Sequence, residues 1–161
     1  IAEKVGIGAV IYTYVKSGRE RDIVFSWDEI LDFEGDTAPY LMYTYARTMS
    51  IIRKAKEQGF VPTTDEANIR LLTDDEEYSV VRSLADYEDA IKKAVASNEP
   101  FMIARAVSSV ARSFNRFYNN SSILGADTDE RKTARLALCE AVCNTIKSGL
   151  NLLGIKEVER M

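Results

Sequence analysis

Residues 100–120, with the sequence PFMIARAVSSVARSFNRFYNN, carry the clearest structural signal in this chain of 161 residues. Apolar side chains recur there at steps of three and four residues, at positions Ile103, Val107, Val110, Phe114 and Phe117. This spacing predicts a helix that buries one face in a core. The residues just before it, Asn98-Glu99-Pro100, are a typical helix start.

Helix signals of the same kind recur along the rest of the chain, and no stretch of any length alternates as a strand would. Residues 1–15 are apolar nearly all round, and residues 59–72 are predicted to be a loop or short turn. Further helix starts are predicted at Ser26-Trp27-Asp28-Glu29, Thr37-Ala38-Pro39, Thr73-Asp74-Asp75-Glu76, and Asp127 with Glu130. We therefore expect one all-α domain over residues 1–161, a helical bundle of about five to six helices.

The charges are unevenly distributed. The net charge of −4 at first argues against a nucleic-acid partner. However, residues 61–99 carry 4 basic and 10 acidic groups, whereas residues 100–161 carry 9 basic and 6 acidic groups. Arg105, Arg112 and Arg116 share the face opposite the core of the 100–120 helix. This stripe could track a phosphate backbone, or it could be the solvated face of an ordinary amphipathic helix.

Several classes of function are disfavoured. The chain has no histidine, which removes Ser-His-Asp and Cys-His catalysis and imidazole metal sites. Gly6-Ile7-Gly8 lacks the third glycine and the preceding strand of a dinucleotide site. Cys139 and Cys143 are expected to be reduced core thiols, and the carboxylates of Asp74-Asp75-Glu76-Glu77 suit a helix start better than a metal. With no membrane span or secretory signal, we expect a cytoplasmic, non-catalytic chain.

The helix that follows Pro39 has an unusual second face. Its apolar stripe is formed by Leu41, Tyr45, Ile52 and Ala55. Tyr40, Tyr43 and Arg47 are spaced to share a separate face, with Lys54 further along. Two tyrosines beside an arginine could stack unpaired bases. Equally, the tyrosine rings could pack against a neighbouring helix with their hydroxyls exposed.

Residues 33–43, followed by Ala46 and Arg47, closely resemble a signature of arginyl-tRNA synthetases. The resemblance extends along nearly the whole chain, in the same order, through residues 5–9, 22–28, 114–118, 133–138, 152–155 and 159–161. It implies the C-terminal, all-α anticodon-binding domain of that family, called DALR-type. It also implies that Met161 is the native C-terminus, and that the N-terminal domain and the Rossmann catalytic domain precede Ile1.

The resemblance implies a set of contacts to the anticodon loop. The loop residues among them are Phe33, Glu34, Gly35, Asp36 and Thr37, and the helix residues are Tyr40, Tyr43 and Arg47. The set also includes Tyr118 and Met161, together with Arg53, which matches a basic family position. On a helical projection Arg53 points away from Tyr40 and Tyr43. Met42 stands where the family usually has a glutamine, which puts any hydrogen bond from that side chain in doubt.

The expected partners are arginine tRNA, through its anticodon loop, and the catalytic domain of the same chain; no membrane and no DNA are expected. The catalytic domain would bind ATP and arginine, so we expect no cofactor and no ligase activity in these residues themselves. The acidic block of residues 61–99 should then face away from the tRNA. Two alternatives remain open. One is a helical protein-interaction module with Tyr40 and Tyr43 in a partner's groove, and the other is a self-contained enzyme.

Overall fold

Seven helices and no strand make up the protein in a computed structural model that describes residues 1–161. The elements are α1 (Ala2–Val15), α2 (Trp27–Ile30), α3 (Ala38–Glu57), α4 (Glu66–Ile69), α5 (Asp75–Ser97), α6 (Phe101–Asn120) and α7 (Asp129–Leu152). Five helices are long, whereas α2 and α4 are single turns. The all-α bundle predicted from the sequence is confirmed, and α4 is the short turn within residues 59–72.

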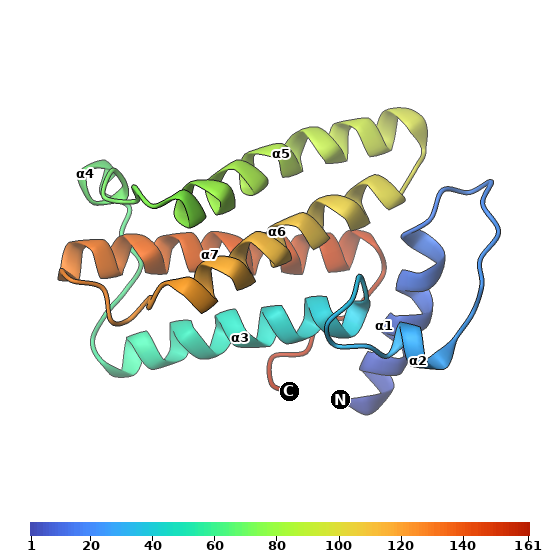
Figure 1. Ribbon diagram of the computed structural model, residues 1–161, viewed down its shortest axis with the longest axis horizontal. Coiled ribbons are helices and arrows are strands. Elements are labelled where there is room, and N and C mark those ends of the chain that lie inside the picture. The colour runs from blue at the N-terminus through green and yellow to red at the C-terminus, as the bar shows by residue number, and fades with distance from the viewer.

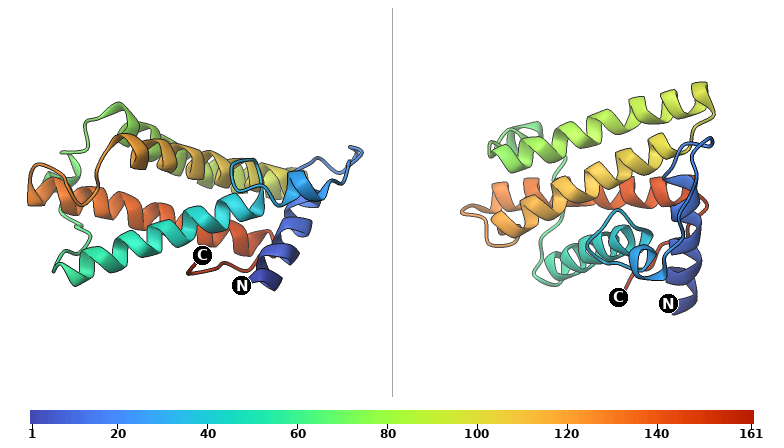
Figure 2. Two further views of the ribbon diagram at one scale, coloured as in Figure 1. Left: turned by 60° about the horizontal axis from the view of Figure 1, so that its bottom comes forward. Right: turned by 45° about the vertical axis from the view of Figure 1, so that its right-hand side comes forward.

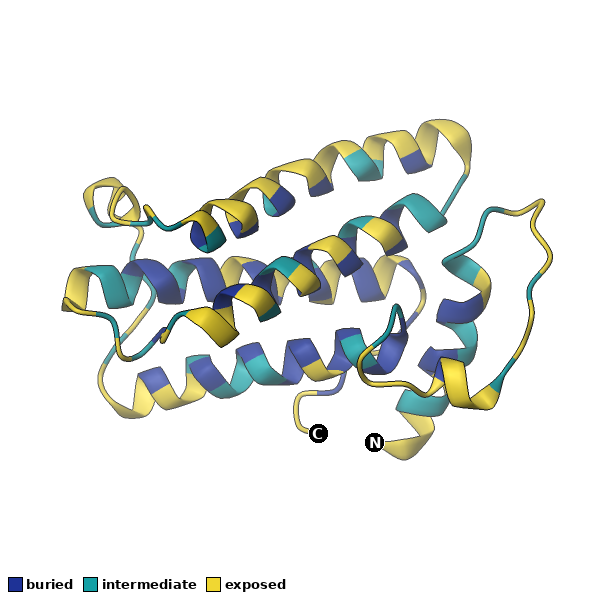
Figure 3. Cartoon of the chain, viewed as in Figure 1, coloured by how far each residue is buried: buried dark blue, intermediate teal, exposed yellow.

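The long helices lie side by side, and α1 crosses their end (Figure 1). Figures 1 and 2 place α6 and α7 between α3 and α5, so the acidic α5 lies on the opposite side of the bundle from α3. The buried faces of α3, α6 and α7 point toward one another (Figure 3). All five apolar positions predicted on the 100–120 helix are buried, and they join a core of 28 residues.

The helix starting at Trp27 is present, but the capping box predicted there is not, because Ser26 makes no side-chain cap hydrogen bond. Caps do mark the starts of α3, α5 and α7, and two of these differ from the sequence prediction. Thr37 caps α3 as predicted, since its Oγ1 accepts the Tyr40 N–H at 3.3 Å. In α5 the carboxylate of Glu77 accepts the backbone N–H of Asp74 at 2.9 Å, one residue later than predicted. In α7 the cap is Thr128, not Asp127, because the Thr128 hydroxyl accepts the hydrogen bond from the Arg131 N–H, at 3.2 Å.

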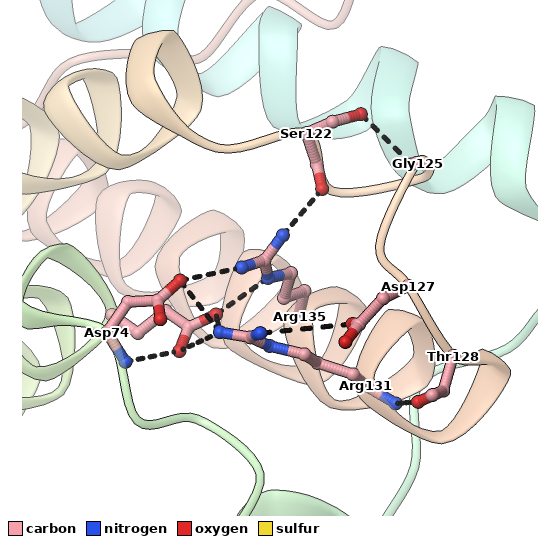
Figure 4. A network of polar contacts seen from close by, with 8 residues as sticks. Asp74, Ser122, Gly125, Asp127, Thr128, Arg131 and Arg135 are labelled. Atoms are coloured by element: carbon pink, nitrogen blue, oxygen red, sulfur yellow. Dashed lines mark hydrogen bonds and ion pairs between the residues drawn. The ribbon is translucent and has the colours of Figure 1, made fainter.

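A buried ionic network explains the position of the α5 cap (Figure 4). Glu77 is fully buried and accepts a hydrogen bond from Arg135 Nε at 2.6 Å. Arg135 also reaches Asp74 Oδ2 at 2.9 Å and donates to the Ser122 carbonyl at 2.8 Å, while Arg131 reaches Asp74 at 2.7 Å. The start of α5, the α6–α7 loop and α7 are joined in this way. The carboxylates of Asp74 and Glu77 therefore have a structural role.

The C-terminal segment folds back beside α1 and α3, so that both ends of the chain lie near each other (Figure 1). Helix α7 ends before Gly154, whose φ of 75° is a left-handed conformation that suits glycine. Ile155 and Val158 are buried, and Lys4 of α1 donates to the Glu157 carbonyl at 3.3 Å. These contacts place residues 159–161 against α3. No helix is both long enough and apolar enough to cross a bilayer.

Candidate nucleic-acid interface

An open groove of about 420 Å³ lies where α3, the end of α6 and the C-terminal segment meet. We call it the α3 groove. It is lined by Tyr43, Ala46, Arg47, Ser50, Ile51, Arg53 and Lys54 of α3, by Tyr118 of α6, and by Glu159, Arg160 and Met161. Three segments that are distant in sequence therefore form one surface.

Arg47 is held between two aromatic rings at the centre of this groove. Its guanidinium carbon lies 4.8 Å from the centroid of the Tyr43 ring and 4.7 Å from that of the Tyr118 ring. Its Nη1 donates to Asn115 Oδ1 at 2.5 Å. The Asn115 amide is itself oriented, because it donates to the Tyr40 hydroxyl and to Thr44 Oγ1, both at 2.9 Å. The half-buried arginine therefore has a defined direction in an open groove.

The groove is positively charged as well as aromatic. Arg47, Arg53, Lys54 and Arg160 line it with one opposing carboxylate, that of Glu159, and none of the four cations forms an ion pair. Tyr43 and Tyr118 are 41% and 40% exposed as residues, so each keeps a surface open to solvent. Unpaired cations beside exposed aromatic rings are the elements that bind the phosphates and bases of single-stranded nucleic acid.

An apolar groove of about 860 Å³ adjoins the α3 groove. It is lined by Ile1, Ala2, Val5, Gly6, Trp27, Leu31, Phe33, Tyr43 and Met161. Tyr43 and Met161 line both grooves and so form the wall between them. Phe33, from the loop before α3, is 48% exposed on the apolar side. The predicted residues Phe33, Tyr43 and Met161 therefore lie together although the sequence separates them widely.

The other residues of the 33–37 loop lie outside both grooves. Asp36 faces the bundle, where its Oδ1 accepts hydrogen bonds from Tyr12 Oη at 2.9 Å and Ser108 Oγ at 2.6 Å. Burial, followed by the charge of Asp36, raises the pKa of Tyr12. Thr37 is buried as the α3 cap and its hydroxyl donates to the Asp32 carbonyl. Asp36 and Thr37 therefore fix the conformation of the loop by contacts to the bundle and within the loop. Glu34 is exposed and Gly35 is half-buried, and neither lines a groove.

Two residues of α3 lie differently from their helical projection. Tyr40 is half-buried at the edge nearest α6, and its hydroxyl accepts from Asn115, so it does not line the groove with Tyr43. Arg53 was projected away from Tyr43, yet both line the α3 groove, which lies between α3 and the C-terminal segment. Met42 is fully buried facing α1, where a Cβ at Gly8 would lie 2.4 Å from its Cε. This position therefore has no access to a ligand.

Some lining residues were not predicted as site residues. Ser50 follows Tyr43 and Arg47 at steps of seven and three, so extending the helical spacing beyond Arg47 would have found it. Lys54 also lines the groove, and the sequence already indicates that it lies further along the same face of the helix. Glu159 and Arg160 carry no such signal, because their position depends on how the C-terminal segment folds back. Asn115, which orients Arg47, is visible in the sequence only as part of the 114–118 motif.

Comparison with known proteins identifies the family of the chain. The family model described as "DALR anticodon binding domain" matches residues 41–161. A curated relative from Clostridium botulinum, named arginine–tRNA ligase, is 50% identical over 161 residues, which are 100% of this chain and 28% of the relative. A relative of the same name from Clostridium kluyveri is 46% identical over 160 residues, 99% of this chain and 28% of the relative. The chain thus spans about 28% of the length of these relatives.

Solved structures show the same fold. The arginyl-tRNA synthetase of Thermus thermophilus superposes with a TM-score of 0.87 and 32% identity, covering 99% of this chain and 27% of that one. The Plasmodium falciparum enzyme gives a TM-score of 0.81 at 24% identity, covering 99% of this chain and 28% of that one, and supports the fold alone. The resemblance found in the sequence is therefore confirmed: the chain belongs to the DALR anticodon-binding domain family, in the form found in arginyl-tRNA synthetases.

Proposed function

We propose that the α3 groove binds the anticodon loop of arginine tRNA. The observation that carries this proposal is Arg47, held between the exposed rings of Tyr43 and Tyr118 in a groove whose four cations have no ionic partner. A splayed base can stack on an aromatic face for about 1–3 kcal/mol, and unpaired cations attract the phosphates on either side of it. An apolar partner helix from another protein would leave these cations buried without partners, which is costly.

The groove also supports recognition of a cytosine, the central base that arginine anticodons share. Cytosine presents an amino donor and ring acceptors, and a carboxylate beside a guanidinium matches that pattern. Glu159 and Arg160 supply this pair next to Met161 at the wall between the two grooves. We assign Met161 and Phe33 to apolar contact with base faces, and Arg53 and Lys54 to the phosphates. Glu34 and Gly35 stay candidates for contacts from the exposed edge of the loop.

Within a longer synthetase, binding the anticodon here would orient the tRNA so that its distant acceptor end reaches the catalytic domain. ATP and arginine would bind that catalytic domain, which is the expected partner within the same chain. The residues in this chain contribute recognition and no bond-making step. Cys139 and Cys143 are both free and buried, which suits a reducing compartment, and we place the domain in the cytoplasm with the rest of protein synthesis.

Fluorescence anisotropy with a labelled arginine anticodon stem-loop tests the proposal. The comparison is a stem-loop in which uracil replaces the central cytosine, with each titrated at several salt concentrations. We expect the exchange to weaken binding by about tenfold or more, the value of one hydrogen bond to a charged group. Affinity should fall as salt rises. Equal binding of both stem-loops would overturn the recognition of cytosine, and a salt-independent complex with a protein but none with RNA would favour an interaction module.

A further inference from the structure

A second pocket, of about 300 Å³, lies between α5 and α6, outside both grooves. It is lined by Ser79 of α5 and by Ser109, Arg112, Ser113 and Arg116 of α6, with no apolar side chain. We call it the Ser/Arg pocket. Arg112 and Arg116 belong to the exposed arginine stripe seen in the sequence, whereas Arg105 packs over the Phe101 ring at 5.1 Å and lies outside the pocket. Proteins use hydroxyls and guanidinium groups of this kind to hold phosphate.

The pocket contains hydrogen-bond donors that the protein does not use. The Arg116 guanidinium and the Ser109 hydroxyl make no hydrogen bond, and Arg116 makes no ion pair. Arg112 uses only Nη2, which donates to Ser108 Oγ at 2.8 Å and lies 3.9 Å from Asp36. Its remaining N–H groups are free. Two cations and a hydroxyl therefore offer unused donors to one small volume.

The nearest carboxylates flank this pocket without lining it. The pKa of Glu76 is lowered chiefly by a hydrogen bond from Asn120 at 3.0 Å, and to a smaller extent by the positive charge of Arg116, so Glu76 offsets only part of that charge. Asp36 is held by Tyr12 and Ser108 and reaches Arg112 only at 3.9 Å. No carboxylate lines the pocket itself. The free donors and the two positive charges therefore favour a small anion with several acceptor oxygens.

Helix α6 links the pocket to the α3 groove. Tyr118 lies on the flank of α6 that faces α3, whereas Ser113 and Ser109 lie on the flank that faces α5. Along the axis, Tyr118 and Arg112 are six residues apart, a rise of about 9 Å, and the two flanks are separated by about one helix diameter of 10 Å. An RNA whose loop occupies the groove needs only a few nucleotides to reach the pocket.

We propose that the Ser/Arg pocket binds a backbone phosphate of the RNA whose loop occupies the α3 groove, an inference that rests on the proposed function. The pocket has no aromatic side chain and no carboxylate to distinguish bases. Its contact therefore adds affinity and salt dependence without reading sequence, as contacts to a phosphate backbone do. The α3 groove supplies discrimination, and the Ser/Arg pocket fixes the direction in which the RNA crosses α6.

Arg116→Gln in the 161-residue chain tests this proposal, with Arg21→Gln as the matched control. Arg21 is an exposed arginine without a side-chain partner, in the loop between α1 and α2, and it lines neither the Ser/Arg pocket nor the two grooves. Anisotropy with the arginine anticodon stem-loop is measured from about 50 to about 200 mM salt. Arg116→Gln should weaken binding about three- to tenfold and reduce the slope of log K against log salt by about 0.7–0.9. Discrimination at the central base should not change.

Two further variants sharpen the test. Arg116→Lys should restore the salt slope because it keeps the charge, and Ser109→Ala should weaken binding without changing the slope. An unchanged slope in Arg116→Gln, with wild-type discrimination intact, overturns the phosphate site and leaves the proposed function standing. Equal losses in Arg116→Gln and Arg21→Gln overturn it too, because they indicate diffuse attraction. If the wild-type chain does not bind the stem-loop at all, the proposed function fails first and this inference with it.

Discussion

Replacing Arg47 by alanine tests the centre of the α3 groove most directly. The substitution removes a guanidinium that lies 4.8 Å from the Tyr43 ring and 4.7 Å from the Tyr118 ring, together with its hydrogen bond to Asn115. Alanine is the best helix former, so α3 itself is not weakened. Asn115 keeps its bonds to Tyr40 and Thr44. The loss is therefore confined to contacts that the arginine itself makes.

The cost in stability can be worked from those contacts. Two cation–π contacts at partly exposed sites contribute about 0.5–1 kcal/mol each. The hydrogen bond to Asn115 adds about 1 kcal/mol, which water in the open groove partly replaces. The total is about 2 kcal/mol, or a fall in Tm of about 4–8 °C for a chain of this size. Loss of one stacked, charged contact should weaken RNA binding by about 5- to 150-fold, the equivalent of about 1–3 kcal/mol.

Lys56→Ala provides the matched control, because Lys56 is an exposed cation on the same helix, outside the groove and without an ionic partner. Thermal unfolding followed by circular dichroism gives Tm, and anisotropy with the arginine stem-loop gives affinity. Lys56→Ala should change neither by more than a small amount. A fall in Tm of more than about 10 °C in Arg47→Ala would refute this estimate and make Arg47 a structural residue. Unchanged RNA binding in a folded Arg47→Ala protein would refute its role in the groove.

Three further predictions concern the groove wall, the buried network and the C-terminal segment. Deletion of Met161 should weaken stem-loop binding with little change in Tm. Glu77→Ala should cost about 3–5 kcal/mol, because it removes the buried carboxylate and leaves the Arg135 guanidinium with only the partly exposed Asp74 as ionic partner, whereas Glu76→Ala should change Tm little. Burial alone would raise the pKa of Glu157, but a backbone hydrogen bond and the neighbouring Lys147 together lower it. The stabilising effect of the Glu157 carboxylate is therefore present above the ordinary pKa of 4.5 and lost as pH falls below that value. Acid titration of Tm in Glu157→Gln should therefore be flatter than in wild type.

The elements that the sequence predicted best are those set by local spacing. The buried positions of α6 follow from apolar residues at steps of three and four, because a helix that packs on one face buries whatever lies there. The start of α3 at Thr37 follows from a cap and a proline within four residues. Such signals need no knowledge of the rest of the chain. They were sufficient for the fold class and for the approximate bounds of five long helices.

The displaced start of α5 depends on a tertiary contact. Thr73 with Glu76 and Asp74 with Glu77 fit a capping box equally well in the sequence, and Glu77 forms it because Arg135 of α7 binds its carboxylate in the core. At the start of α7 the contact is local instead, since the Asp127 carboxylate lies 3.8 Å from Arg131 four residues later. Sequence spacing cannot show which of two adjacent carboxylates finds an arginine in another helix.

The candidate site divides in the same way. The resemblance to a family identified residues that lie close together in the fold. It could not distinguish the residues that line the groove from those that hold the surrounding backbone in place. Asp36 belongs to the second kind, since Tyr12 and Ser108 hold its carboxylate against the bundle. Met161 reaches Tyr43 only because Ile155 and Val158 are buried and draw the C-terminal segment back along α1 and α3. That path is a property of the packed fold.

The charge distribution shows why net charge was a poor guide to partners. The net charge of −4 comes from an acidic block of which α5 carries most, and α5 packs on the side of α6 and α7 away from α3. The α3 groove gathers Arg47, Arg53, Lys54 and Arg160 from two segments, so its local sign is opposite to that of the whole chain. Salt screens charges beyond about 8 Å at physiological ionic strength, and a bound RNA therefore responds to the surface it touches. An acidic domain can thus bind a polyanion across α3 and α6, while the acidic residues of α5 beyond them limit where else that RNA can bind.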